Sequence, residues 1–320
     1  MSKALPPVDV VIVVLCWRNQ VYLPQLLASV AAQEGGVNLE LVVCNNASVP
    51  LLLSEERAQP EKLHSIASGA NLGYGGGNNF AIDWVRQRWN PRYLLVLNSD
   101  VCLHAGALQA WLTWADQHPE QAVVGAVQVD PSRKGQVCHG GHNYNRGLSV
   151  ISAYRPSNTS GPDYVHGAAM LVRASAFANE PVFNDGYFLF FEELELAARV
   201  KQKGLQTGYC PGAKVSHFEG GSRSQHYADF QPEVVEYFEN INALRFTRDH
   251  CAQYLLTVLL FRVLAKPLYL ALRGERRRLV FWALAVGDFF RSRVRRFPFQ
   301  AGWLPAAGRD QITDAPWPGK

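Results

Sequence analysis

The chain has 320 residues, of which 48% are hydrophobic and 18% charged. This globular composition fits one large α/β domain with an extension, or two domains. The net charge of +4 is unevenly spread, because residues 1–239 hold 17 Lys and Arg against 22 Asp and Glu, whereas residues 240–320 hold 14 against 5. The basic last quarter indicates an anionic partner for that segment alone, and no nucleic acid is expected as a partner.

The cysteines and the first residues indicate the cellular compartment. None of the six cysteines stands in CxxC spacing, which excludes a zinc ribbon or a thioredoxin motif. Cys16, Cys44 and Cys102 lie in or beside apolar runs, where a buried thiol is the ordinary role. Because the sequence MSKALPP leads straight into an apolar run without a secretory signal, we expect a protein of the reducing cytoplasm.

Apolar runs that fit buried strands alternate with segments of helical spacing over the first 130 residues. Continuous rather than alternating apolar character is typical of parallel strands covered on both faces. The predicted order gives an α/β fold with a mostly parallel, doubly wound sheet. Strands are predicted at residues 9–17, 39–44, 64–67, 93–97 and 123–129, and helices at residues 22–33, 78–89 and 105–118.

The pattern loosens in the middle of the chain and then returns. Residues 134–162 are rich in Gly, Asn, Ser and Tyr, which predicts a loop or irregular hairpin over a binding cleft. A strand is predicted at residues 168–173. A helix is predicted at residues 191–203, with three glutamates in its first turn, where acidic side chains suit the helix dipole.

The C-terminal part is apolar and basic. Residues 254–272 lack a clean run of about twenty apolar residues, so no transmembrane helix is predicted there. Pro267 is expected to kink this helix. A second apolar block at residues 279–290 ends in RSRVRR. Four basic residues are expected to share one helical face: Arg262, Lys266, Arg273 and Arg277.

Two interpretations of this C-terminal extension remain open. Apolar faces with basic rims are what a helix on an anionic membrane surface needs. The same pattern also fits a helical hairpin packed on the main domain, with its basic face in water.

The run LLVLNSD places polar groups at the end of a buried strand, where ligands of open α/β sheets bind. Asp100 can hold a divalent cation on the diphosphate of an activated sugar donor, with Asn98 contributing an oxygen directly or through water. A strand-end turn is the alternative role for Asp100.

About twenty residues earlier stands the glycine-rich run NLGYGGGNN, which is not a dinucleotide-binding GxGxxG and does not follow the first strand. Its density of glycine and asparagine favours a ligand-facing turn over a simple tight turn. The candidate donor-binding residues in this run are Asn71, Gly73, Gly75, Gly76 and Asn78.

The three glutamates of FFEELEL cannot all face one place. Glu192 and Glu195 share a side of the helix, while Glu193 points about 100° away. One of this set can take the proton of an acceptor hydroxyl. The alternative is that all three only decorate the first helical turn.

Histidines supply further candidates. His217 follows a predicted strand and can complete a metal site as a neutral imidazole, with a purely structural role as the alternative. His139, His142 and His166 are candidates for the acceptor site.

Five segments together resemble glycosyltransferase family 2: NLGYGGGNN, LLVLNSD, VHGAAMLVR, GYFLFFEELELAARVKQKG and VSHFEGGS. The likeness runs in the family's order and is strongest to the rhamnosyltransferase-like members that build bacterial surface polysaccharides. It implies a GT-A fold, an inverting mechanism and a Mg²⁺ or Mn²⁺ cofactor. It implies that Asp100 binds the metal as part of a DxD-like element that begins at Asn98, and that His217 is a second metal ligand. By the same resemblance, Glu192 and Glu193 match the family's acid pair, and Glu193 supplies the catalytic base.

Two positions depart from the family's pattern. The segment VVCNNAS has Asn45 where the family usually has an aspartate that reads the pyrimidine ring, so a hydrogen bond can form without charge assistance. The base position is Glu193 rather than aspartate, a longer arm that requires a shifted backbone or acceptor. The polymerase signature QxxRW and a set of transmembrane spans are missing from the sequence, which favours a single-sugar transferase over a polymer synthase.

The resemblance favours transfer of L-rhamnose from dTDP-rhamnose, with a UDP-sugar as the second choice, onto a lipid-linked or oligosaccharide acceptor. A non-catalytic sugar-nucleotide-binding or glycan-binding protein on the same fold is the alternative. A nucleotidyltransferase is less favoured, because no lysine-rich phosphate loop occurs near the N-terminus. We expect the transferase domain over residues 1–230 and a helical extension over residues 231–320, in a cytoplasmic protein that can lie peripherally on the inner face of the membrane.

Overall fold

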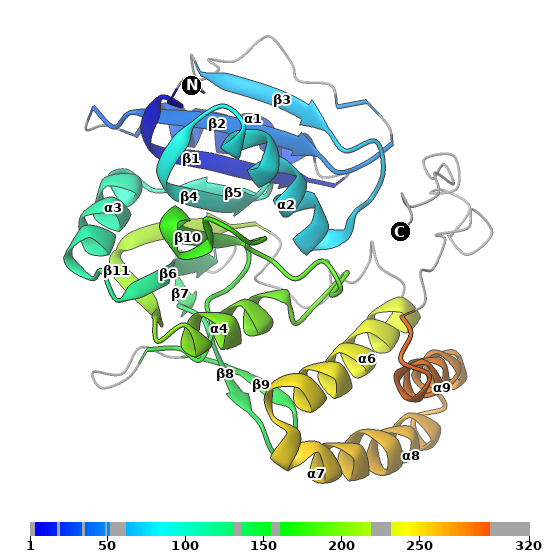
Figure 1. Cartoon of the computed structure of the whole chain (residues 1–320). Coiled ribbons are helices and arrows are strands. Elements are labelled where there is room, and N and C mark those ends of the chain that lie inside the picture. The colour runs from blue at the N-terminus through cyan, green and yellow to red at the C-terminus, as the bar shows by residue number, and fades with distance from the viewer. Residues whose placement is uncertain are drawn as a thin grey trace. The chain divides into compact units, whose positions relative to one another are not determined.

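The structure is a computed structural model and describes residues 4–17, 20–33, 36–48, 50–51, 62–130, 136–154, 161–218 and 232–294, with the side chains of residues 130–139 left out (Figure 1). The chain divides into two compact units. The first unit comprises Met1–Asn143, Ala153–Gly186 and Glu192–Gly221, and the second comprises Tyr144–Ser152, Tyr187–Phe191 and Ser222–Lys320. The boundary predicted after residue 230 lies outside the described residues.

The first unit is built on a nine-stranded sheet in the order β3-β2-β1-β4-β10-β6-β11-β5, with β7 paired to β6. The strands β3, β2, β1 and β4 are all parallel, and β11 is parallel to β6. Strand β10 is antiparallel to both β4 and β6. Strand β5 pairs antiparallel with β11, and β7 pairs antiparallel with β6. The strands are β1 (Pro7–Cys16), β2 (Leu39–Asn45), β3 (Leu63–Ala67), β4 (Asn90–Asn98), β5 (Val101–Leu103), β6 (Gln121–Asp130), β7 (Gln136–His139), β10 (Ala169–Arg173) and β11 (Gln206–His217).

Helices cover both faces of this sheet. Side chains alternate along β1, so that Val10 and Ile12 pack with α1 and α3 on one face, while Val11 and Val13 pack with α2 and α4 on the other. The prediction of a doubly wound α/β fold is therefore confirmed. The helical segments of the first unit are η1 (Gln20–Tyr22), α1 (Leu23–Ala31), α2 (Gly73–Arg86), α3 (Ala107–Gln117), η3 (Ala174–Phe177) and α4 (Glu192–Gln202).

Two segments can be compared with their sequence-based predictions, and the first differs in its start. Helix α2 begins at Gly73, five residues before the predicted start, so the glycine run forms the first turns of a helix. Of the loop or irregular hairpin predicted for residues 134–162, the structure shows a hairpin of β8 (His142–Asn145) and β9 (Val150–Ala153). Gly75 and Gly77 of α2 stand where the helix approaches other groups closely, so a larger residue would crowd its neighbours there.

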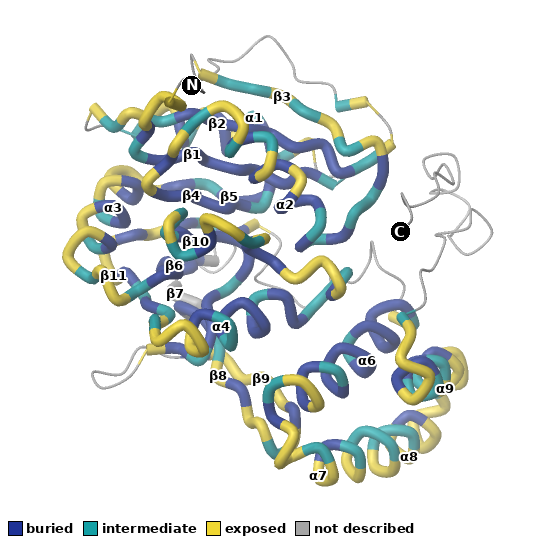
Figure 2. The backbone as a smooth tube through the Cα atoms, in the orientation of Figure 1, coloured by how far each residue is buried: buried dark blue, intermediate teal, exposed yellow. Residues whose placement is uncertain are grey.

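The second unit is helical. Its core joins Tyr237, Phe238 and Ile241 of α6 to Phe281 and Phe289 of α9. The exposed side of α7 and α8 faces away from α6 (Figure 2). Its elements are α6 (Pro232–His250), η4 (Ala252–Tyr254), α7 (Leu255–Leu259), the π-helical segment η5 (Leu260–Ala265), α8 (Lys266–Leu272) and α9 (Arg276–Phe290).

The helix that contains Pro267 differs from the sequence-based expectation. The chain stays helical from Ala252 to Leu272 and is long and apolar enough, by length and composition, to cross a membrane. Pro267 has no N–H for the carbonyl four residues earlier, and the six-residue π-helical segment comes just before it. The expected common face of four basic residues is wrong, because Arg277 lies on the separate helix α9.

Candidate functional site

Strand pairing brings Asp100 and His217 together. Asp100 lies in the tight turn between β4 and β5, and the antiparallel pairing of β5 with β11 sets His217 opposite Val101. The backbone N–H of Phe218 donates to the Asp100 carbonyl at 3.0 Å. The Asp100 carboxylate Oδ2 is 3.1 Å from His217 Nε2, and the two side chains are 2% and 3% exposed. Two residues far apart in the sequence thus form one buried polar pair.

Two more histidines continue from this pair. The His166 ring centroid is 5.5 Å from that of His217 and 5.3 Å from that of His142. His166 Nδ1 accepts the backbone N–H of Ala168 at 3.1 Å. Of the three candidates for the acceptor site, His166 therefore lies next to the Asp100–His217 pair, and His142 lies next to His166. The side chain of His139 lies outside the described residues.

The acid pair begins helix α4. Glu192 is 1% exposed and Glu193 is half-buried. Burial raises the pKa of both carboxyl groups above the usual glutamate range, and for Glu192 the neighbouring Glu193 charge raises it further. The Glu193 carboxylate accepts the backbone N–H of Gly167, which partly offsets the effect of burial on its pKa. Two adjacent carboxyl groups oppose each other's ionisation, so the pair favours a state that carries a single negative charge.

Tyr74 completes this cluster and was not singled out by the sequence analysis. Its hydroxyl donates to the carbonyl of Gly167 at 2.6 Å. Burial raises the pKa of the Tyr74 hydroxyl well above its usual value, and the charges of Glu193 and Glu192 add to this effect. A Cβ atom on Gly167 would lie 2.1 Å from Glu193 Oε1, so only glycine leaves room for the carboxylate. An aromatic residue inside a glycine run was the only signal in the sequence.

Gly167 therefore lies between the two polar groups of the site. Its backbone contacts Glu193 and Tyr74, and the preceding residue is His166, whose ring packs against His217. The Asp100–His217 pair and the acid pair thus both contact the His166–Gly167 segment, which leads into β10.

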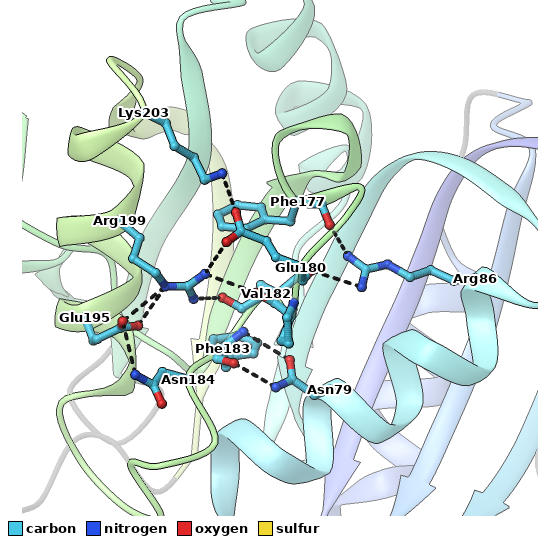
Figure 3. Close-up of polar contacts among 11 residues, drawn as sticks. Asn79, Arg86, Phe177, Glu180, Val182, Phe183, Asn184, Glu195, Arg199 and Lys203 are labelled. Carbon is cyan, nitrogen blue, oxygen red and sulfur yellow. Dashed lines mark hydrogen bonds and ion pairs between the residues drawn. The ribbon is translucent and has the colours of Figure 1, made fainter.

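The third glutamate of the helix has a structural role. Arg199 Nε donates to both carboxylate oxygens of Glu195 at 3.1 and 3.0 Å, and Asn184 also donates to Glu195 (Figure 3). Arg199 further donates to the carbonyls of Pro181 and Val182. Glu195 is thus fully committed to holding the segment before the acid pair, which leaves Glu192 and Glu193 as the candidates for chemistry.

The same segment is fastened to helix α2. Asn79 and Phe183 exchange two hydrogen bonds between the amide side chain and the backbone, at 2.8 and 3.0 Å (Figure 3). Arg86 donates to the carbonyls of Phe177 and Glu180. Residues 177–184 therefore join helices α2 and α4, which fixes the start of α4 relative to the glycine run.

The glycines of α2 allow close approach. Gly73 starts the helix with a φ of 76°, a conformation that glycine adopts without strain. A Cβ on Gly75 would lie 3.2 Å from Phe183 Cβ and 3.7 Å from Glu192 Cγ, and one on Gly77 would lie 2.7 Å from Leu15 Cδ1. The run thus brings helix α2 against the end of β1 and against the acid pair.

Asn46 is a second residue that the sequence analysis did not single out. It is 1% exposed. Its Nδ2 donates to the carbonyl of Gly73 at 3.0 Å and to Asn71 Oδ1 at 3.3 Å, and its Oδ1 accepts the N–H of Leu72 at 3.0 Å. Asn71 Oδ1 in turn accepts the N–H of Gly73. Asn46 therefore holds the backbone where α2 begins. Its only signal in the sequence was that it directly follows Asn45.

We predict that Asn46→Ala lowers the free energy of unfolding by about 2–3 kcal/mol, because it leaves the N–H of Leu72 and the carbonyl of Gly73 without their buried partner. Urea denaturation followed by circular dichroism measures this change. The control is Asn38→Ala, which removes exposed hydrogen bonds of the Asn38 side-chain amide. It should lower the free energy of unfolding by less than about 1 kcal/mol. Equal costs for the two variants would contradict the assigned role of Asn46.

Two bulky residues directly before the acid pair carry backbone strain. Phe190 and Phe191 have φ angles of 67° and 74°, which side chains of this size rarely adopt. Within the second unit, Asn242 of α6 donates to the carbonyls of Leu189 and Phe190 at 2.9 and 3.1 Å. Strain of this kind persists only where the surroundings enforce it, and it clusters at functional sites.

The donor set of the Asp100–His217 pair fits a divalent cation. Asp100 offers a carboxylate oxygen and His217 an imidazole nitrogen, and these two atoms are 3.1 Å apart. Over the described part of the chain, no three His, Cys, Asp or Glu side chains gather into a metal cluster. The protein would then supply two ligands, and phosphate oxygens and water the rest.

Comparison with known proteins identifies the family. The model of glycosyl transferase family 2 matches residues 11–177, more than half of the chain. The chain is 22% identical to the low-salt glycan biosynthesis hexosyltransferase Agl10 of Haloferax volcanii, over 70% of this chain and 71% of that protein. It is 26% identical to the N-acetylglucosaminyl-diphospho-decaprenol L-rhamnosyltransferase of Mycobacterium tuberculosis, over 49% of this chain and 59% of that protein.

Solved structures share the fold. The TarS 1–349 structure of S. aureus in complex with UDP-GlcNAc superposes with a TM-score of 0.55 at 16% identity, over 89% of this chain and 81% of that chain. The mannosyltransferase PcManGT of Pyrobaculum calidifontis, solved with GDP-Man and Mn²⁺, superposes with a TM-score of 0.52 at 12% identity, over 92% and 91%. These likenesses confirm the GT-A type of fold. On the family match and the shared fold, the chain belongs to glycosyl transferase family 2, in a branch that resembles the rhamnosyltransferases.

Proposed function

We propose that this glycosyltransferase is inverting and metal-dependent, and that it moves one sugar from a nucleotide donor onto a lipid-linked or saccharide acceptor. The observation that carries the proposal is that the Asp100–His217 pair contacts His166 while the acid pair contacts the next residue, Gly167. The name of the mycobacterial relative supports L-rhamnose as the sugar and a lipid-linked acceptor. We therefore rank dTDP-rhamnose first among donors and a UDP-sugar second.

In this proposal Glu193 is the general base. Its carboxylate, held by the N–H of Gly167, takes the proton of the acceptor hydroxyl as the acceptor oxygen attacks the anomeric carbon of the donor. The bond from that carbon to the diphosphate oxygen breaks, and the nucleoside diphosphate leaves with the bonding electron pair. Glu192 stays protonated, so that a second negative charge does not oppose ionisation of Glu193.

Asp100 and His217 are the residues that would hold Mg²⁺ or Mn²⁺. The cation, when bound, supplies positive charge that stabilises the developing negative charge on the diphosphate. His217 can serve as a ligand only as the neutral imidazole, and Asp100 only as the carboxylate. Asn98, half-buried at the end of β4, can add an oxygen directly or through water.

The proposed donor-binding residues fall into two groups by their burial. Asn45, Gly73, Gly75 and Asn78 are buried, and Asn78 Nδ2 donates to the carbonyl of Tyr74 within its own helix. Asn71, Gly76 and Asn98 are half-buried and are the members of the set that a donor can reach. The buried members then act by shaping the backbone at the start of α2.

Asn45 tests how the base of the donor is read. We expect Asn45→Asp to leave the choice of donor unchanged or to tighten pyrimidine nucleotide binding by about 1 kcal/mol, about fivefold, because a charge-assisted hydrogen bond replaces a neutral one. Calorimetric titration with UDP, dTDP and GDP measures the change. A marked loss of affinity would show that the amide donates to a carbonyl of another base, and GDP-sugars would then rank first.

The function itself is tested by turnover. The full chain with Mn²⁺ is titrated calorimetrically with UDP-, dTDP- and GDP-sugars, and release of the nucleoside diphosphate is then followed with each donor that binds. We expect one donor class to be hydrolysed slowly or transferred. Tight donor binding without any release would favour the alternative, a non-catalytic sugar-nucleotide-binding protein on the same fold.

A further inference from the structure

One face of the helix Ala252–Leu272 is apolar and exposed. Its most apolar 18-residue window has a mean hydropathy of 1.8, yet only 11% of that window is buried. Phe261 and Tyr269 on this helix are 37% and 49% exposed. Five leucines at every fourth position, which we call the leucine stripe, are 51–80% exposed: Leu256, Leu260, Leu264, Leu268 and Leu272. A helix in the core of a soluble bundle buries such residues.

The π-helical segment helps to keep the stripe on one side. A spacing of four residues exceeds the 3.6 residues of an α-helical turn, so the leucines of a regular α-helix would drift around its axis. The wider turns of Leu260–Ala265 offset that drift in the middle of the helix. The exposed positions of α7 and α8 accordingly lie on the side away from α6 (Figure 2).

The opposite side of the helix is polar and faces the protein. Arg262 donates to the carbonyl of Ser149 at 2.6 Å and to Asn240 Oδ1 at 3.3 Å. Lys266 Nζ lies 3.1 Å from Glu236 Oε1, and Glu236 is fully buried. Charges therefore point inward and leucines outward, the reverse of a helix that packs its apolar face on a core.

Exposed arginines stand at the end of the stripe. Arg273, Arg276 and Arg277 are exposed, and residues 240–320 carry nine more positive than negative charges. Anionic lipid headgroups are the complement of this combination of leucines and arginines. A two-fold contact with a second copy of the chain would instead bring the same arginines into one interface.

We propose that the leucine stripe lies in the headgroup–acyl boundary of an anionic membrane, with the helix parallel to the surface and the three arginines at the lipid phosphates. The helix does not cross the bilayer, because Arg262 and Lys266 bind Ser149, Asn240 and Glu236 of the same unit. The surface is independent of the proposed sugar transfer, so either can fail without the other.

Vesicle sedimentation of the full chain tests the proposal. The protein should co-sediment with phosphatidylcholine vesicles that contain phosphatidylglycerol. Much less of it should co-sediment with pure phosphatidylcholine vesicles. The triple variant Leu256→Gln, Leu264→Gln, Leu268→Gln should bind the anionic vesicles about tenfold more weakly, equivalent to about 1.4 kcal/mol. Val21→Gln, a control at a residue 74% exposed in the first unit, should bind like the wild type.

A second variant separates charge from apolar insertion. Replacing Arg273, Arg276 and Arg277 with Gln should remove the preference for anionic vesicles and the release by salt. The proposal is overturned if the leucine variant pellets as well as the wild type. It is also overturned if the wild type binds neither kind of vesicle. If the leucine variant then converts a dimer into a monomer, a second copy of the chain covers the stripe.

Discussion

Replacing Glu193 with glutamine is expected to lower the rate of sugar transfer by about 10²-fold or more while leaving donor binding little changed. That factor is the usual contribution of a general base. The amide keeps the shape of the carboxyl group but cannot accept the acceptor's proton. Steady-state kinetics give the rate, and calorimetry with the non-transferred nucleotide gives the binding.

Glu192→Gln is the matched control at the neighbouring position. Glu192 is the more buried acid, and burial and the Glu193 charge raise its pKa. In the proposed mechanism Glu192 acts in its neutral form, which glutamine imitates. We expect its rate to fall much less than that of Glu193→Gln. If the two variants exchange these effects, Glu192 is the base.

The pH dependence follows from the same pair. Because burial raises the pKa of Glu193 above the ordinary glutamate range, the rate of sugar transfer should rise with pH at values above that range.

The stability of the fold should depend on pH through Glu192, whose pKa is also raised in the folded protein. The contribution of Glu192 to stability is complete below its pKa in the unfolded chain and is lost as pH rises through its pKa in the folded protein. The unfolding free energy of Glu192→Gln, relative to the wild type, should therefore increase with pH.

Replacing Asp100 with alanine is expected to abolish metal-dependent nucleotide binding while the fold stays intact. The carboxylate is one of the two protein ligands proposed for the cation. Mutation of a residue that only hydrogen-bonds to a metal ligand already lowers metal affinity by about 10- to 100-fold. Nucleotide affinity of the variant in Mn²⁺ should equal that of the wild type in EDTA. Titration calorimetry measures both values.

Two controls accompany the Asp100 variant. Asp83→Ala removes an exposed carboxylate whose ion pair is with Arg86 on its own helix and should leave nucleotide binding unchanged. His217→Ala should lower the metal-dependent part of the affinity in the same direction as Asp100→Ala. The assignment of the metal site fails if the wild type binds its donor equally well with and without EDTA.

The sequence by itself determined the layers of the first unit and the local position of several site residues. Continuous apolar runs such as that of β1 specify buried parallel strands, because strand propensity and burial act over a few neighbouring residues. Asp100 could be placed at a strand end for the same reason. The 100° step between Glu192 and Glu193 is a property of any helix, and only Glu193 of the two is half-buried.

Only the tertiary structure decided which of these residues meet. The pairing of β5 with β11 sets His217 beside Asp100, and the loop before β10 brings Gly167 to Glu193. The glycines that had suggested a turn form the first turns of α2, because they pack against groups distant in sequence. The orientation of the leucine stripe likewise depends on the burial of Glu236 beneath Lys266. Long-range pairing and burial depend on the packing of the chain around each residue, whereas local sequence patterns report only on close neighbours.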